Sequence, residues 1–309
     1  MTKSALILAP AWSMFSSVVH ADTQTRATVD VSVSGIGDSN PFLEQNGDST
    51  ASGNIKIDPA VYWEDESSTV IVDGSLRLAQ YTNRYGTDLG GRVGVQGNQK
   101  LDERTSMFAR AGYQSTRSSI RDSFFQNTSA PLDPESFPQV ALTDVTIAGS
   151  RVRVKTLDAS AGVDYALSPV DQIGFSADTS YSKFGGASGT DYRTGLGRLQ
   201  YGRRLSERTV FTASVEAGVA DYIGQAIGDA KIISPTIGIE SKLSERLRWT
   251  ASVGISYASI DADNNITRNN VYLAGEFSIC DAGLQSTFCG SLSRSAQPTA
   301  LGGISAVTN

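Results

Sequence analysis

The sequence predicts an all-β fold in which antiparallel strands run up and down, as in a transmembrane β-barrel with at least fourteen strands. The first reason is a repeat. The segment Leu205–Thr209 recurs 38 positions later at Leu243–Leu247, and apolar residues occupy every second position after each copy. Such alternation gives a strand one apolar face. A short polar turn, an alternating strand, a longer polar loop and a second alternating strand together form a β-hairpin repeat.

The lengths of the connections are the second reason. Turns such as Leu205–Thr209 are short, whereas the other connections, at 184–190, 223–230 and 261–269, are longer and rich in Gly, Asn and Asp. Bacterial barrels have short periplasmic turns and longer external loops. The short turns are therefore expected at the periplasmic end, with the N-terminus of the barrel in the periplasm.

The start of the chain is the third reason. Lys3, the apolar stretch 5–15 and the small residue Ala21 read as a secretory signal peptide over residues 1–21, followed by the barrel at 22–309. A buried N-terminal strand or helix is the alternative. Beyond Ala21 no stretch approaches the ~18 apolar residues of a membrane helix. A membrane-embedded mature chain must then cross as a closed barrel, which satisfies every backbone polar group.

The first five strands are expected at 28–35, 54–63, 70–78, 89–99 and 107–113. Valines at alternate positions mark the first strand, an acidic turn at 64–66 separates the second from the third, and the turn at Leu101 follows the fourth. An insertion at 118–150 comes next, long enough to fold inward and narrow the barrel or to cap it. Loops of this length are usually functional or disordered.

The later strands are expected at 151–167, 173–183, 192–205, 210–222, 231–243, 247–259, 271–280 and 287–293, with a fourteenth starting near 301. In the sixth, the apolar phase changes between Val154 and Leu157. This predicts either a β-bulge or a strand that continues above the membrane. The chain stops at Asn309 without the terminal Phe or Trp usual in such barrels, so we expect that its last strands are missing.

Aromatic residues near strand ends are expected to form girdles at the two membrane interfaces, which amphipathic rings prefer. Ordinary enrichment of aromatics in strands is the alternative. The girdle residues are Trp63, Phe175, Tyr181, Tyr201, Phe211, Tyr222, Trp249, Tyr257 and Tyr272.

The face opposite the apolar positions carries charges of both signs, which a packed soluble core would have to desolvate at high cost. We expect these residues to line a lumen: Lys56, Asp58, Asp73, Arg77, Arg92, Arg110, Asp158, Asp164, Asp178, Arg198, Glu216, Glu240 and Lys242. Three of them, Arg77, Arg92 and Arg110, either form a basic patch for an anionic solute or pair with neighbouring carboxylates.

Composition argues against several classes of function. Loss of the signal peptide moves the formal net charge from −6 to about −7, so the basic footprint of a nucleic-acid binder is missing. The only histidine, His20, lies in that peptide. A nucleophile would lack its usual base, so no enzyme activity and no catalytic residue are expected. Neither a metal site nor a cofactor motif is recognisable.

Two cysteines, Cys280 and Cys289, flank the next short turn that the repeat predicts. In an exported protein they are expected to form a disulfide across this periplasmic hairpin. Two free thiols are the alternative.

The segment Gly35–Phe42, together with the Leu-Ser-Glu-Arg turns, resembles a family of proteobacterial outer-membrane barrels described as beta-barrel porin-2-like or surface-polysaccharide-associated. The resemblance implies a location in the outer membrane of a Gram-negative bacterium. It implies a water-filled pore for small solutes or polysaccharide, with the lipid bilayer and the outer-membrane assembly machinery as partners. The alternatives are a structural or adhesive barrel with a plugged lumen, or a secreted soluble β-solenoid.

Overall fold

The computed structural model describes residues 24–38, 49–82, 85–117, 152–185, 190–224, 227–262, 266–282, 287–298 and 304–308. The predicted signal peptide at 1–21 and the insertion at 118–150 lie outside these residues. Within the described residues, no helix is long and apolar enough to cross a membrane.

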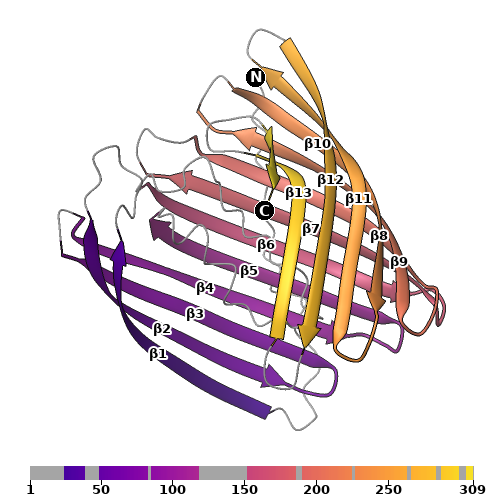
Figure 1. Cartoon of the computed structure of the whole chain (residues 1–309), viewed down its shortest axis with the longest axis horizontal. Helices are drawn as coiled ribbons and strands as arrows, with labels where there is room; N and C mark the ends of the chain where they lie inside the picture. The colour runs from indigo at the N-terminus through magenta and orange to yellow at the C-terminus, as the bar shows by residue number, and fades with distance from the viewer. Residues whose placement is uncertain are drawn as a thin grey trace.

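One sheet contains all fourteen strands, each hydrogen-bonded to its neighbours in sequence, and every ladder is antiparallel. The up-and-down β fold is confirmed, and the antiparallel order excludes a β-solenoid. Figure 1 shows the sheet curling on itself, so that β11 to β13 pass in front of the middle strands. Within the described residues no ladder joins β1 to β14. The strands are β1 Gln24–Asp38, β2 Thr50–Glu64, β3 Ser68–Tyr81, β4 Thr87–Lys100, β5 Thr105–Arg117, β6 Arg153–Ala166, β7 Asp171–Phe184, β8 Tyr192–Arg204, β9 Thr209–Tyr222, β10 Ile227–Lys242, β11 Leu247–Ala262, β12 Ile266–Ala282, β13 Thr287–Pro298 and β14 Ile304–Thr308.

The short turns share one device, which explains the sequence repeat. In the five short turns that the structure describes, a side-chain oxygen of Asp or Ser accepts the backbone N–H two residues further on, as in Asx and ST turns. In four of them it also accepts the N–H three residues further on. Asp102 accepts from Arg104 and Thr105, both at 2.7 Å. Ser244 accepts from Arg246 at 3.2 Å and Leu247 at 3.0 Å. The same contacts recur around Asp65, Ser168 and Ser206, with only the first contact present at Ser206.

Four of these five turns also contact the end of a neighbouring strand. The carbonyl of the third turn residue accepts an N–H from the end of the strand beyond, as Arg208 does from Lys242 at 2.8 Å and Arg104 from Ala166 at 2.8 Å. The turns therefore lock the strand ends to one another laterally. The short turns lie at one end of the sheet, and the longest connections, at 39–49, 118–152 and 185–191, lie at the other, which we call the end with long connections. Two connections predicted to be long are short: only 223–226 separate β9 from β10, and only 263–265 separate β11 from β12, because β10, β11 and β12 extend further than the alternation predicted.

Strand alternation gives the sheet an apolar face and a polar face. Large aliphatic side chains on the apolar face are exposed, including Val31 at 63%, Val253 at 53% and Leu273 at 60%. Exposed apolar area on this scale marks a surface that contacts something other than water.

The register of β6 is continuous against both neighbours, from Arg153 to Ala166. The predicted β-bulge is therefore wrong, and the alternative, a strand that continues past the apolar band, agrees with the register. Val154 lies on the polar face because it packs against a buried cluster there, whereas Leu157 lies on the apolar face, 56% exposed. The register shifts instead in β10, between Ile227 and Ala230.

Candidate functional site

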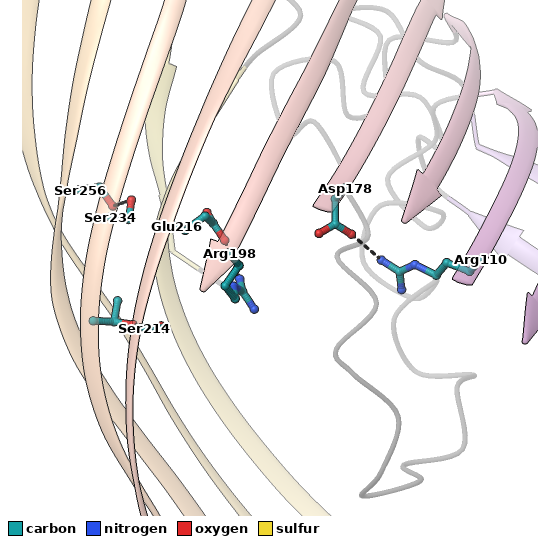
Figure 2. Close-up of polar contacts among 8 residues, drawn as sticks. Arg110, Asp178, Arg198, Ser214, Glu216, Ser234 and Ser256 are labelled. Atoms are coloured by element: carbon teal, nitrogen blue, oxygen red, sulfur yellow. Dashed lines mark hydrogen bonds and ion pairs between the residues drawn. The ribbon is translucent and has the colours of Figure 1, made fainter. Parts of the chain in front are cut away.

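The charged residues predicted to line a lumen all fall on the polar face, by the register of their strands. In Figure 2 the side chains of Arg110, Asp178 and Arg198 point into the space that the curled sheet surrounds. The polar face is therefore the inner face of the sheet.

Ion pairs between neighbouring strands account for many of these charges. Nη2 of Arg92 on β4 lies 2.8 Å from Oδ2 of Asp73 on β3. Nη2 of Arg198 on β8 lies 2.6 Å from Oε2 of Glu216 on β9. These side chains stay between 27% and 55% exposed, so the pairs are solvated rather than buried. Pairs of this kind contribute little to stability but fix where charge sits.

Two further ion pairs differ from these, one because it lies within a single strand and the other because its atoms are further apart. Lys56 and Asp58 pair along β2, with Nζ 2.9 Å from Oδ2. Glu240 on β10 lies 3.9 Å from the guanidinium of Arg248 on β11, a residue that the lumen prediction omitted. Its place on the polar face was readable from its even position in β11.

One pair spans three strands. Nη2 of Arg110 on β5 donates to Oδ1 of Asp178 on β7 at 3.3 Å (Figure 2). Ser160 on β6 stands between them in register and is 5% exposed. Its hydroxyl has no hydrogen-bond partner among the described atoms. A long Arg side chain thus crosses a whole strand, and a polar atom remains available beneath it.

The sequence left open whether Arg77, Arg92 and Arg110 form a basic patch or pair with carboxylates, and the structure answers this for two of them. Arg92 and Arg110 contact Asp73 and Asp178, which favours paired lumen charges over a patch for anions. Arg77 lies opposite Lys56 in the β2–β3 ladder.

Within the described part of the chain, Asp158, Asp164 and Lys242 have no ion-pair partner. Glycines of adjacent strands make room for the two carboxylates. Asp158 lies over Gly112, where an added Cβ would be 3.0 Å from a carboxylate oxygen, and Asp164 lies over Gly174. No three His, Cys, Asp or Glu side chains among the described residues gather as metal ligands would.

Hydroxyl pairs fill the polar face between the charges. The Ser180 and Thr194 oxygens are 2.7 Å apart, as are those of Ser214 and Thr236. Ser234 donates to Ser256 at 2.8 Å, and both appear beside the ion pairs in Figure 2. This face therefore offers water and polar solutes both donors and acceptors.

An aromatic cluster, absent from the lumen prediction, occupies the polar face at the end with long connections. The ring of Tyr192 lies 5.9 Å from that of Phe184 and 5.7 Å from that of Tyr222, measured between centroids. Tyr192 is 2% exposed, so the cluster is packed rather than open to solvent. Even numbering in β7, β8 and β9 was the signal that could have found it.

The girdle prediction needs two corrections. Tyr222 and Tyr272 lie on the polar face, where Tyr222 is 5% exposed and Tyr272 packs against the aromatic cluster. The strands keep strict alternation, so Tyr222 cannot share a face with Phe211, eleven positions earlier. The other seven predicted residues lie on the apolar face, where Phe175 is 53% exposed.

Some girdle contacts have the expected amphipathic form. The Tyr201 hydroxyl donates to Asp171 at 2.5 Å, at the end with short turns. The prediction missed Tyr113 and Tyr165, which are 41% and 40% exposed on the same face. Period-two alternation with Ala111 and Val163 was the signal for both.

Cys280 and Cys289 are directly opposed across β12 and β13, their Cα atoms 4.1 Å apart, and their sulfurs are bonded. The described residues contain no free cysteine. The pair flanks the short connection after Ala282, as the repeat predicts.

Comparisons with solved structures return outer-membrane proteins, although no family model and no curated protein matches the chain. The ferric enterobactin receptor of Pseudomonas aeruginosa is 13% identical with a TM-score of 0.48, and the match covers 89% of this chain. The chain spans only 51% of the length of that receptor. An outer membrane channel of Pseudomonas putida F1 is 9% identical with a TM-score of 0.42, over 88% of this chain and 97% of the channel. A bacterial polysaccharide outer membrane secretin is 11% identical with a TM-score of 0.44, over 91% of this chain and 94% of the secretin.

Proposed function

We propose that this protein is an outer-membrane β-barrel whose polar face lines a water-filled pore for small solutes or surface polysaccharide. The observation that carries the proposal is that the sheet has a charged inner face and an apolar outer face. Ion pairs such as Arg198–Glu216 and Arg110–Asp178 lie on the inner face, opposite an outer face of exposed aliphatic side chains. A soluble protein would reverse this arrangement.

Electrostatics supports water in the interior. Moving paired charges into a dry core costs several kcal/mol for each ion. The side chains of Arg92 and Arg198 are instead 55% and 40% exposed. Barrels widen with strand number, and ~16–18 strands leave an aqueous channel whereas 8 are filled by side chains. A barrel of at least fourteen strands is wide enough for a cavity.

Both signs of charge are present on the inner face in neighbouring pairs, so the pore should discriminate weakly between cations and anions. Hydroxyl pairs such as Ser214–Thr236 would suit neutral, hydroxylated solutes, which exchange hydrogen bonds with such groups readily. Catalysis is not part of the proposal, since the only histidine of the chain is His20. We include in it a cleaved signal peptide at 1–21 and insertion by the outer-membrane assembly machinery.

A second candidate is a structural or adhesive barrel with a plugged lumen. The cluster of Phe184, Tyr192 and Tyr222 favours it, because packed rings on the inner face reduce the open cross-section at one end. The buried cluster around these rings extends from β6 to β11, and Tyr272 of β12 packs against it. Among the described residues, those of β1 to β5 contribute none to it, which leaves room for a pore beside the cluster.

Single-channel recording in planar bilayers distinguishes the two candidates. The full chain, folded in detergent, should show heat-modifiable mobility on a gel and insert with stepwise conductance. Neutral oligosaccharides or polyethylene glycols of increasing size would then measure the pore width by their effect on the current. Folded protein that inserts without conductance would support the plugged barrel, and folded protein that stays water-soluble would contradict the membrane assignment.

A further inference from the structure

The outer face has a groove at the end with long connections, separate from the pore. It has a volume of about 440 Å³ and runs over β3, β4 and β5. Its walls are Leu76, Leu89, Val93 and Tyr113, each at least 41% exposed. Glycines at positions 74 and 91 form its floor, since they place no side chain between those walls.

Arg153 crosses the outer end of this groove. From β6 its guanidinium donates to the Leu89 carbonyl at 2.6 Å and lies 3.5 Å from the Ser115 hydroxyl, so it reaches over β5 to β4. It also contacts Asp88 at 2.8 Å, and Arg117 lies 3.7 Å from the same carboxylate oxygen. One carboxylate thus serves two guanidinium groups.

Two lysines extend the positive charge along the same face. Lys155 lies opposite Ser115 of the groove and directly opposite Lys183 of β7. Both lysines are exposed, and within the described part of the chain neither has a carboxylate within 4 Å. Like charges directly opposed across two strands destabilise a sheet unless an anion lies between them.

Other charges near this group do not neutralise it. Asp191, beyond Lys183, accepts the backbone N–H of Phe184 at 2.8 Å. Arg193, opposite Tyr181, pairs with Asp221. Arg153, Arg117 and the two lysines therefore outnumber the carboxylates around them.

The lysines stand at the border of the apolar surface. One step along each strand, on the same face, are Leu157 and Tyr181, themselves opposed in the ladder. Leu157 is 56% exposed, so apolar surface begins directly below the charges. An anionic headgroup at this height would have its hydrocarbon chain beside the groove.

We propose that this surface binds a phosphate-bearing lipid of the outer leaflet, with an acyl chain in the groove and the phosphate against Lys155, Lys183 and Arg153. The phosphate would supply the counter-charge that the opposed lysines lack, and the groove would hold the chain where glycines thin the surface. Basic side chains near a membrane surface attract anionic lipid in this way. The proposal rests on the membrane assignment above and not on conductance.

Lipid binding to the folded full chain, measured by native mass spectrometry, tests the site. The probes are phosphatidic acid, a diacylglycerol with the same acyl chains, and inorganic phosphate. We expect phosphatidic acid to bind at least tenfold tighter than diacylglycerol, with little competition from inorganic phosphate. K155Q and K183Q should each weaken phosphatidic acid roughly fivefold, and the double variant roughly 25-fold, at about 1 kcal/mol for each charge. The matched control K231Q removes an exposed lysine from the outer face of β10 and should change nothing.

A second variant tests the groove. V93W fills it and should weaken phosphatidic acid without loss of heat-modifiable mobility. Equal binding of phosphatidic acid and diacylglycerol, or equal effects of K155Q and K231Q, would overturn the headgroup site, and unchanged binding by V93W would overturn the groove. These failures leave insertion and conductance intact, whereas a protein that never enters bilayers contradicts the membrane assignment itself.

Discussion

An arginine at position 253 should destabilise the protein sharply, because Val253 lies at the centre of the outer face of β11. It is 53% exposed, and its ladder neighbours are Ile237 on β10 and Gly275 on β12. Neither neighbour offers an acceptor for a guanidinium. Trp249 and Tyr257, on the same face, are each four residues away.

The expected loss of unfolding free energy depends on how deep position 253 lies in the membrane. Four residues span ~13 Å of strand, or ~10 Å along the membrane normal at a tilt of ~40°. The apolar band of such barrels is ~25 Å tall, so Val253 lies near its middle. Val253→Arg should therefore cost ~2–4 kcal/mol of unfolding free energy, the range for Arg at the bilayer midplane.

Two matched variants separate depth from chemistry. Ser252→Arg places the same side chain on the polar face, and Tyr257→Arg places it at the edge of the apolar band, where ~0–1 kcal/mol is expected. The assay is reversible urea unfolding of protein refolded into phosphatidylcholine vesicles, followed by tryptophan fluorescence. If Val253→Arg costs no more than Ser252→Arg, the assignment of the two faces is refuted. If Tyr257→Arg costs more than Val253→Arg, the position of Val253 near the middle of the apolar band is refuted.

Three further predictions concern the turns, the polar face and the disulfide. Hydrogen bonds from the backbone N–H of Arg104, and then from the Thr105 hydroxyl, lower the pKa of Asp102. The contribution of Asp102 to stability should therefore be fully present above the unfolded pKa of ~3.9 and disappear as pH falls through the lower folded pKa. Urea unfolding between pH 2 and 7 should show a smaller acid loss in D102N than in the parent, and identical pH profiles would contradict this. Arg110→Gln should leave Asp178 unpaired and shift the reversal potential toward cation selectivity, while Asp178→Asn shifts it the other way; shifts of the same sign would contradict the pore lining. Replacing Cys280 and Cys289 by Ser should preserve the heat-modifiable fold but slow its formation, and loss of the folded band would show that the disulfide is required.

The strands and turns were predictable because their signals are local. Alternation with period two and the Asp or Ser at the start of each turn act within a few residues, and the hydrogen bonds of Asp102 and Ser244 show why that position recurs. The polar face followed from the same alternation. The disulfide followed from the repeat, since it places both cysteines beside one short turn.

Features that depend on contacts between distant parts of the chain could not be predicted from the sequence. The Arg110–Asp178 pair skips a strand, so it depends on the register of two ladders and on the reach of a side chain. The apolar residue Val154 looked like a slip in register because its buried partners are remote in sequence. Tyr222 was assigned to the girdle from its position near a strand end, although its even number places it on the other face.

Accessibility along β11 tests the central claim most directly. Single cysteines placed at positions 251 to 256, in a chain whose two native cysteines are replaced by Ser, would carry spin labels in refolded vesicles. Positions 251, 253 and 255 should collide with oxygen dissolved in lipid, and positions 252, 254 and 256 with a water-soluble nickel complex, in strict alternation. Collisions with the nickel complex at all six positions would mean that the sheet lies in water, and would contradict a membrane barrel with an aqueous interior.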